Sequence, residues 1–312
     1  MNQQTDTQKD MEDIKLTSVK SGQDNKTSSI TKGILCIISA AFFFALMGAF
    51  IRLSGDIPSM QKSFFRNFIA FIIVIVTITK NKEKLEIKKG DMKYLIMRSV
   101  FGTVGIICNF YAVDHLVLSD ASMLNKLSPF FVIIFSFIIL KERFNIIQGM
   151  AVVVAFIGAL FIIKPTGNMD HIPALIGALG GVGAGAAYSM VRVMGKRKVN
   201  GNLIIMFFSA FSCLVCLPFM IINFKPMTVY QFIMLIMTGV AAAGGQFSVT
   251  RAYFYAPAKE ISVYDYSQII FSAMLGFILF GQIPDVSIVA GYLIIFAVAL
   301  FMFFYNKKKA EE

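Results

Sequence analysis

The residues in this chain best suited to chemistry are polar side chains set inside long apolar runs. Asn125 and Lys126 interrupt the apolar segment 119–144, and Asp265 and Tyr266 take the matching positions of the segment 259–284, which has the same length. A polar group in hydrocarbon is costly, so such residues commonly mark a transport pathway or a binding site. Their repetition at matched positions is the main indication of function in this sequence.

Other buried polar residues could contact a solute in the same place. We expect a cavity with a cationic half formed by Arg66 and Lys126 and a mixed half formed by Arg251 and Asp265. The amides and phenols that would orient the solute are Asn109, Tyr111, Asn125, Tyr188, Gln246, Tyr264, Tyr266 and Gln268. Asp265 could also couple transport to protons, because a carboxyl group surrounded by hydrocarbon can bind a proton near neutral pH.

Some of these charges have simpler explanations. Arg251 and Arg192 lie near predicted helix ends, where a long side chain can extend to the membrane surface. Arg66 could instead form a structural ion pair with Asp114 or Asp120 at the rim of the protein. For these residues the sequence leaves both readings open.

The depth of the two central charges argues against their pairing. A rise of about 1.5 Å per residue places Lys126 roughly 10 Å below the outer surface of the membrane. The same rise places Asp265 roughly 10 Å above the inner surface, in a core about 30 Å thick. The two charges would then differ in height by roughly 10 Å. We therefore expect no salt bridge between them and take Arg251 as the better partner of Asp265.

Residues that perform catalysis or bind metals are scarce. The only histidines, His115 and His171, fall in predicted outer loops, and no H-E-x-x-H, G-x-S-x-G or Walker motif occurs. Cys213 and Cys216 form a C-x-x-C pair, but one helical turn apart in an apolar run they are predicted to be packing residues. We expect no metal, no cofactor, no disulfide and no enzymatic activity.

The elements that must position these residues are membrane-spanning helices. Of the 312 residues, 57% are hydrophobic and only 15% are charged, whereas a soluble domain carries about 25% charged residues. A span requires about 20 apolar residues. The segments that qualify are 33–53, 60–79, 93–113, 119–140, 145–163, 173–194, 201–222, 229–253, 260–281 and 286–305.

Lysine and arginine indicate how the helices are oriented. The net charge of +11 comes from basic residues between the apolar runs, which favours membrane orientation over nucleic-acid binding. The basic stretches are 1–32, 80–93, 141–143, 196–198 and 307–309. Because cytoplasmic loops carry the excess of Lys and Arg, we expect both termini in the cytoplasm and the protein in the cytoplasmic membrane. Residues 1–29 are predicted to form a disordered tail, and 306–312 a short cytoplasmic one.

The chain also contains an internal repeat. A shift of 140 residues lays 93–144 on 233–284 without a gap. Each repeat, 30–164 and 173–305, holds five predicted spans, so the second must enter the membrane inverted. Inverted repeats with a site between them are the architecture of alternating-access carriers.

Short motifs in both repeats point to a family. They are Phe64-Phe65-Arg66 at the second span, the pattern S-x-x-x-x-L-x-x-L-S-P of 119–129 followed by Lys141-Glu142, and Asp265-Tyr266-Ser267-Gln268. Over about residues 30–305 the chain resembles a ten-helix member of the drug/metabolite transporter superfamily, EamA type. It departs from the family pattern at Gln282, where Glu is frequent. The resemblance implies transport of small metabolites, often outward, without specifying a substrate.

Together these observations predict an all-α integral membrane protein of ten helices in two inverted repeats of five. The predicted function is secondary active export of a small organic metabolite such as an amino acid, coupled to a proton or a counter-substrate. A nucleotide-like or cofactor-like anion is the alternative substrate, and a channel or an intramembrane enzyme are the rival classes.

One glycine-rich segment leaves its role open. Small residues occupy 177, 180, 181 and 183–185. They favour close helix packing, and the alternative is a broken helix lining the cavity. A homodimer through such small-residue faces is a further possibility.

Overall fold

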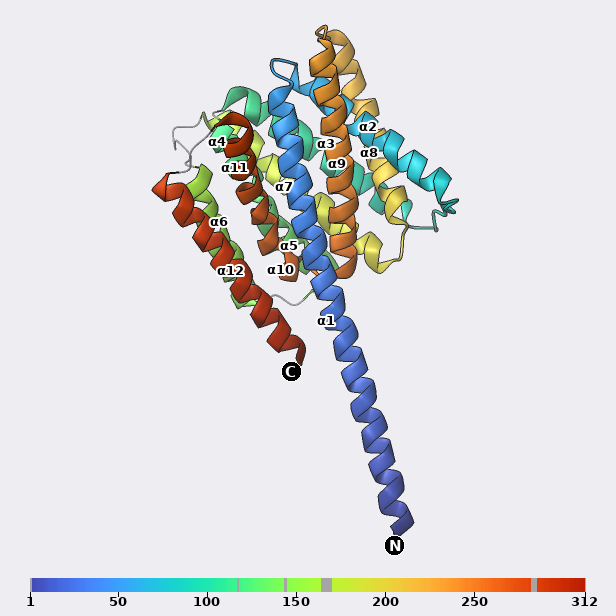
Figure 1. Ribbon diagram of the computed structural model, residues 1–312. Coiled ribbons are helices and arrows are strands. Elements are labelled where there is room, and N and C mark those ends of the chain that lie inside the picture. Colours follow the sequence, from blue (N-terminus) through green and yellow to red (C-terminus); the bar gives the residue numbers. More distant parts are fainter. Residues whose placement is uncertain (1, 117, 143–144, 164–169, 282–284, 312) are drawn as a thin grey trace.

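The chain folds into a bundle of helices (Figure 1). The computed structural model describes residues 2–116, 118–142, 145–163, 170–281 and 285–311, and every regular element in these ranges is helical. The elements are α1 Asn2–Leu53, α2 Ser59–Lys80, α3 Met92–His115, α4 Leu118–Asn125, α5 Ser128–Leu140, α6 Ile146–Ile163, α7 His171–Lys196, α8 Gly201–Ile222, α9 Val229–Tyr255, α10 Ala258–Ile261, the 3-10 helix η1 Ser262–Tyr266, α11 Ser267–Phe280 and α12 Val286–Glu311.

The structure confirms the ten predicted spans. Ten segments of the described chain are long and apolar enough to cross a membrane, and each matches a predicted span to within a few residues. Two of them are interrupted: α4 and α5 together make the span Ser122–Leu140, and α10, η1 and α11 make Ala258–Phe280. The fourth helix of each half is therefore the irregular one.

The N-terminal segment differs from the expectation of a disordered tail. α1 begins at Asn2, and its first half extends as a helix beyond the bundle (Figure 1). The physical reason is that a helix already nucleated in the bundle can extend one residue at a time without a new nucleus. Both termini lie at the same end of the bundle (Figure 1), which we call the terminal end.

The two halves of the chain pack against each other through matched pairs of helices. α1 packs along α9, and the counterpart contact is between α3 and α7. In each half the fourth span packs on the first span of the other half. α5 packs on α7, and α11 packs on α1. α6 packs mainly on α12 at one side of the bundle. The remaining eight spans enclose the centre.

Glycines let α7 approach its neighbours closely. A Cβ on Gly183 would lie 2.9 Å from the carbonyl oxygen of Phe101, and one on Gly185 would lie 2.5 Å from Cβ of Phe131. Real side chains do not tolerate such contacts, so these positions require glycine. α7 is continuous from His171 to Lys196, so the packing interpretation is correct and the broken-helix alternative is wrong. Because this face is occupied within the chain, it is not free for a homodimer.

Polar contacts between the halves gather at the terminal end. Glu142 accepts a hydrogen bond from Nε of Arg192 at 3.2 Å and pairs with Nζ of Lys196 at 2.8 Å. Arg192 also donates to the backbone carbonyls of Tyr253 and Phe254. Arg192 is therefore a structural link between the two halves, where the sequence had suggested a side chain extended to the membrane surface.

Candidate functional site

The central polar residues lie where the fourth spans leave α-helical geometry. α4 ends at Asn125 and α5 starts at Ser128, which leaves Lys126 and Leu127 between the two helices. Pro129 near the start of α5 explains the break, because proline has no N–H to donate and its ring clashes with the carbonyl four residues earlier. The chain thus presents Lys126 at a discontinuity in the middle of the bundle.

The matching span of the second half is interrupted differently. Residues Ser262–Tyr266 form a 3-10 helix between α10 and α11. The Ser262 hydroxyl donates to the carbonyl of Ala258 at 2.6 Å, and the Ser267 hydroxyl donates to that of Tyr264 at 2.7 Å. Serine hydroxyls that bond to nearby carbonyls offer the backbone an alternative to regular helix. Asp265 lies in this 3-10 turn.

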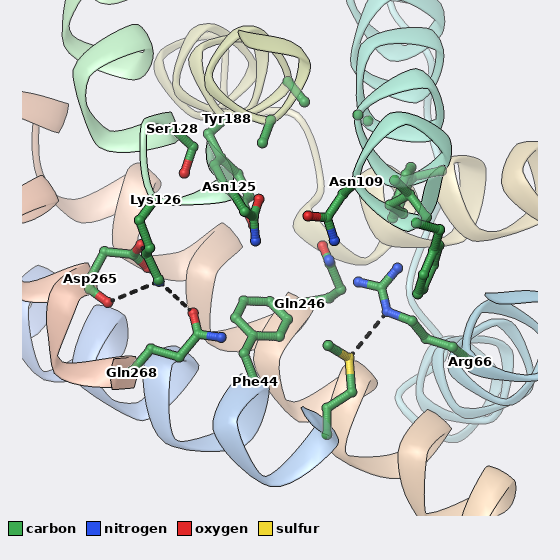
Figure 2. Close-up of a pocket in the computed structure, with 18 of the residues that line it drawn as sticks. Phe44, Arg66, Asn109, Asn125, Lys126, Ser128, Tyr188, Gln246, Asp265 and Gln268 are labelled. Carbon is green, nitrogen blue, oxygen red and sulfur yellow. Dashed lines mark hydrogen bonds and ion pairs between the residues drawn. The ribbon is translucent and has the colours of Figure 1, made fainter. Parts of the chain in front are cut away.

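The two irregular segments meet. Nζ of Lys126 lies 3.2 Å from Oδ2 of Asp265 and donates to Oε1 of Gln268 at 2.7 Å (Figure 2). The Tyr266 hydroxyl donates to the backbone carbonyl of Lys126 at 3.0 Å. Four side chains therefore join the fourth span of one half to the fourth span of the other.

This ion pair contradicts the expectation that Lys126 and Asp265 lie too far apart in height. The estimate assumed continuous α-helices with 1.5 Å rise per residue, whereas a 3-10 segment rises about 2.0 Å per residue, and the long lysine side chain covers further distance. The predicted partner Arg251 is exposed on α9 and does not line the cavity. Pairing between Asp265 and Arg251 was therefore a wrong prediction.

A cavity of about 150 Å³ opens beside the Lys126–Asp265 pair (Figure 2). Helices of both halves line it, and α6 and α12 do not contribute. Its polar lining residues are Arg66, Arg98, Asn109, Asn125, Lys126, Ser128, Tyr188, Gln246, Asp265 and Gln268, and its apolar walls include Phe44, Met47, Ile106, Phe110 and Phe208. The cavity thus combines apolar walls with a few polar groups, as small-molecule sites do.

Most residues predicted for the site do line this cavity. They are Arg66, Asn109, Asn125, Lys126, Tyr188, Gln246, Asp265 and Gln268. Tyr111 is 36% exposed and stacks on His115 at the end of α3, with ring centroids 4.0 Å apart. Tyr266 is fully buried and holds the backbone of Lys126 without lining the cavity. Tyr264 is buried elsewhere at 4% exposed, so Arg251, Tyr111, Tyr264 and Tyr266 are not brought into the lining.

Arg98 also lines the cavity, although it was not predicted as a site residue. Its side chain is only 3% exposed, its Nη2 donates to Oε1 of Gln246 at 3.2 Å, and its guanidinium lies 4.0 Å from the ring centroid of Phe208. The signal was present, because Arg98 stands inside the third apolar run, as Arg66 stands inside the second. Its position near the basic segment 80–93 made it resemble an ordinary charge at a helix end.

The alternative for Arg66, an ion pair with Asp114 or Asp120, concerns side chains outside the described residues. The contact that is described joins Nε of Arg66 to Sδ of Met47 at 3.2 Å. Cys213 and Cys216 are free thiols in α8, and Cys216 is buried. Within the described ranges, no cluster of three His, Cys, Asp or Glu side chains is arranged to hold a metal ion.

A helical bundle of membrane spans with a polar cavity shared by its two halves is the architecture expected of a membrane transporter of small molecules. Residues 31–164 match the model of the EamA-like transporter family. The pseudopaline exporter CntI of Pseudomonas aeruginosa is 31% identical over 269 residues, which cover 85% of this chain and 94% of that protein. The chain belongs to the EamA-like transporter family within the drug/metabolite transporter superfamily.

Other relatives agree with this assignment. A riboflavin transporter of Vibrio cholerae is 22% identical over 290 residues, which cover 90% of this chain and 96% of that protein. Solute carrier family 35 member G1 of Homo sapiens is 25% identical over 281 residues, covering 85% and 77% of the two chains. A solved crystal structure with 14% identity superposes with a TM-score of 0.78 over 90% of this chain and 99% of its own. Members of this family are transporters and not enzymes, so this chain is a multi-pass membrane transporter of a small metabolite.

Proposed function

We propose that this protein is a secondary active exporter that carries a small organic metabolite across the cytoplasmic membrane by alternating access. The single observation that carries the proposal is the cavity between the two halves, with the Lys126–Asp265 pair joining the two interrupted spans. Discontinuous helices at the interface of inverted repeats are where such carriers bind their substrates. Both termini then lie in the cytoplasm, as the distribution of Lys and Arg favours.

The proposed direction and substrate follow from a relative and from the charges of the cavity. The relative that is 31% identical is named as an exporter, which favours outward transport. The cavity holds both signs of charge, which suits an amino acid or a related solute with an amine and a carboxylate. Asp265, beside Lys126 and within the cavity, is the group proposed to couple transport to protons.

A nucleotide-like or cofactor-like anion is the second candidate substrate. The specific observation in its favour is the excess of cations in the lining, where Arg66, Arg98 and Lys126 face the single carboxylate of Asp265. Aromatic walls such as Phe44 and Tyr188 could stack on a ring system. A panel that contains both classes of solute separates the two candidates.

The test is counterflow of labelled metabolites in proteoliposomes, with and without a proton gradient. We expect saturable flux in the wild type and loss of flux in Lys126→Ala and Asp265→Asn. Each single change leaves a polar group in the interior without its partner, at a cost of about 1–3 kcal/mol. Lys84→Ala, in the exposed loop before α3, is the matched control and should retain flux.

A double variant separates folding from transport. Lys126→Met with Asp265→Asn removes both charges together, so it should regain thermal stability that the single variants lose, while flux stays absent. Wild-type flux in the double variant would show that the pair is only structural and would overturn the proposed site. Flux that never saturates would indicate a channel, and gradient dependence that survives in Asp265→Asn would remove the coupling role of that residue.

A further inference from the structure

Two arginines of the cavity have no acidic partner among the described residues. Of the four charged side chains that line the cavity, Lys126 and Asp265 neutralise each other. Arg66 and Arg98 remain, and neither forms an ion pair within the ranges that the structure describes. A buried cation without a counter-ion is costly, so these two side chains require an explanation.

The guanidinium of Arg66 has more N–H donors than the described residues satisfy. Its side chain from α2 is 7% exposed, and Nε donates to the thioether of Met47 at 3.2 Å. A thioether is a weak acceptor. Nη1 is buried and has no hydrogen-bond partner in the described structure. The guanidinium therefore presents unsatisfied donors to the cavity that it lines.

The side chain of Arg98 packs against Phe208, Gln246 and Gly102. The ring of Phe208 and the amide oxygen of Gln246 hold the guanidinium on two sides. A Cβ on Gly102 would lie 2.2 Å from Nη1 of Arg98, so the guanidinium occupies the space that a larger residue at position 102 would need. Nε of Arg98 is buried and has no partner in the described structure. This arrangement fixes the side chain and leaves its charge uncompensated.

We propose that Arg66 and Arg98 form a subsite for an anionic group of the transported substrate, a carboxylate or a phosphate. This inference rests on the proposed function and names the class of substrate. A guanidinium presents planar donors that match the oxygens of both groups. The anion supplies a counter-charge that no residue described in the structure places beside these arginines.

The polar residues away from the two arginines determine which groups the other end of the substrate can carry. Arg66 and the Lys126–Asp265 pair lie at opposite sides of the close-up, with Asn109, Asn125 and Gln246 between them (Figure 2). Amide side chains can donate and accept hydrogen bonds. A substrate that fits has its anionic group at the arginines and polar or amino groups toward Asp265 and Gln268.

The first test measures binding without transport. The purified protein is heated in detergent with amino acids and their amides, benzoate and benzamide, and nucleoside monophosphates and the parent nucleosides. We expect at least one compound with a carboxylate or phosphate to raise the melting midpoint while its counterpart without that group does not. Arg66→Gln and Arg98→Gln should weaken that response about tenfold or more, the loss of one charge-assisted hydrogen bond, and Arg66→Lys should retain part of it. The acid and phosphate arms decide which anion is recognised.

The unliganded variants distinguish a binding role from a structural one. Arg66→Gln should melt at the same or a higher temperature than the wild type without ligand, because it removes a buried uncompensated charge. A structural arginine would give a lower midpoint. Arg251→Gln, an exposed arginine outside the cavity, is the matched control and should keep the full anion response.

The outcomes of this test are distinct from those of the proposed function. The subsite is overturned if no anion stabilises the wild type, or if both glutamine variants keep the full response. Saturable flux with a preference for neutral amides would overturn the subsite while leaving the transporter proposal intact. Anion binding that depends on the arginines, without flux for any compound, would support the subsite and count against the carrier.

Discussion

The two ends of the bundle join the halves of the chain in different ways. At the terminal end, Glu142 binds Arg192 and Lys196, and Asp91 pairs with Arg197. Further side-chain hydrogen bonds cross between the halves there, from Asn200 and Asn202 to Glu83, from Asn145 to Tyr305 and from Gln148 to Asn306. At the opposite end, an ion pair joins Asp56 and Lys225, and Gln61 bonds to the backbone of Lys225.

The two ends differ in how deeply these contacts are buried. The Glu142 and Arg192 side chains are both 11% exposed, whereas Asp56 is 99% and Lys225 48% exposed. Exposed ion pairs contribute little because water and salt screen them, while a partly buried network resists separation. Under the proposed alternating-access mechanism, these contacts would have to separate for the cavity to open at the terminal end.

The same comparison separates structural from functional charge. Buried charges at the terminal end have counter-charges supplied by the protein, whereas no described residue forms an ion pair with Arg66 or Arg98 in the cavity. A protein that folds around uncompensated charge sacrifices stability. That sacrifice is characteristic of sites that must leave room for a ligand.

The largest loss of stability is expected from Glu142→Gln at the terminal end. The change leaves Arg192 and Lys196 without their carboxylate, and removal of a partly buried partner costs about 1–3 kcal/mol of the free energy of unfolding. The measurement is the thermal or denaturant midpoint of the purified protein. Lys196→Gln is the control, because this lysine is 42% exposed and its loss should cost less than about 1 kcal/mol. Equal losses in both variants would contradict the view that burial gives this pair its strength.

An intermediate and pH-dependent effect is expected from Glu83→Gln. Hydrogen bonds from Asn200, Asn81 and Asn202 hold the pKa of the Glu83 carboxyl below its ordinary value. Because the pKa is lower in the folded state, the stability that this carboxylate supplies is present above the ordinary glutamate pKa of about 4.3. It is lost as the pH falls through the lowered value.

The measurement is the melting midpoint of wild type and Glu83→Gln between neutral and acid pH. The wild type should melt higher at pH 7, and the two should converge in acid. Glu86→Gln, in the same exposed loop, should leave the pH profile of the wild type unchanged. A gap between wild type and Glu83→Gln that is constant at every pH would rule out this role of Glu83.

The smallest effect is expected at the opposite end, from Asp56→Ala. Lys225 holds the pKa of the Asp56 carboxyl below its ordinary value, yet the carboxyl is fully in water, so the change should leave the melting midpoint within error. Gln61→Ala should lower the melting midpoint more than Asp56→Ala does. Gln61 is buried and bonds to both the N–H and the carbonyl of Lys225. If Asp56→Ala destabilised the protein as much as Glu142→Gln, the two ends would not differ as described.

Much of the site could be predicted because the cost of polar groups in hydrocarbon is a local property. Each lining residue that was predicted, from Arg66 to Gln268, stands inside an apolar run of the sequence. Tyr111 and Arg251 satisfy the same criterion, but both are exposed in the folded chain. The criterion finds residues inside a span without telling which face of the helix they occupy.

The sequence by itself determined the number of spans, the class of protein and the matched polar positions in the fourth span of each half. These follow from hydropathy, from internal repetition and from proline and serine at the helix breaks, all of which act within one segment. The tertiary structure alone decided that Lys126 meets Asp265, that Arg98 joins the site over Gly102 and Phe208, and that Glu142 joins Arg192 and Lys196 at the terminal end. Those contacts depend on how interrupted helices from opposite halves are placed in register, and no single segment encodes that placement.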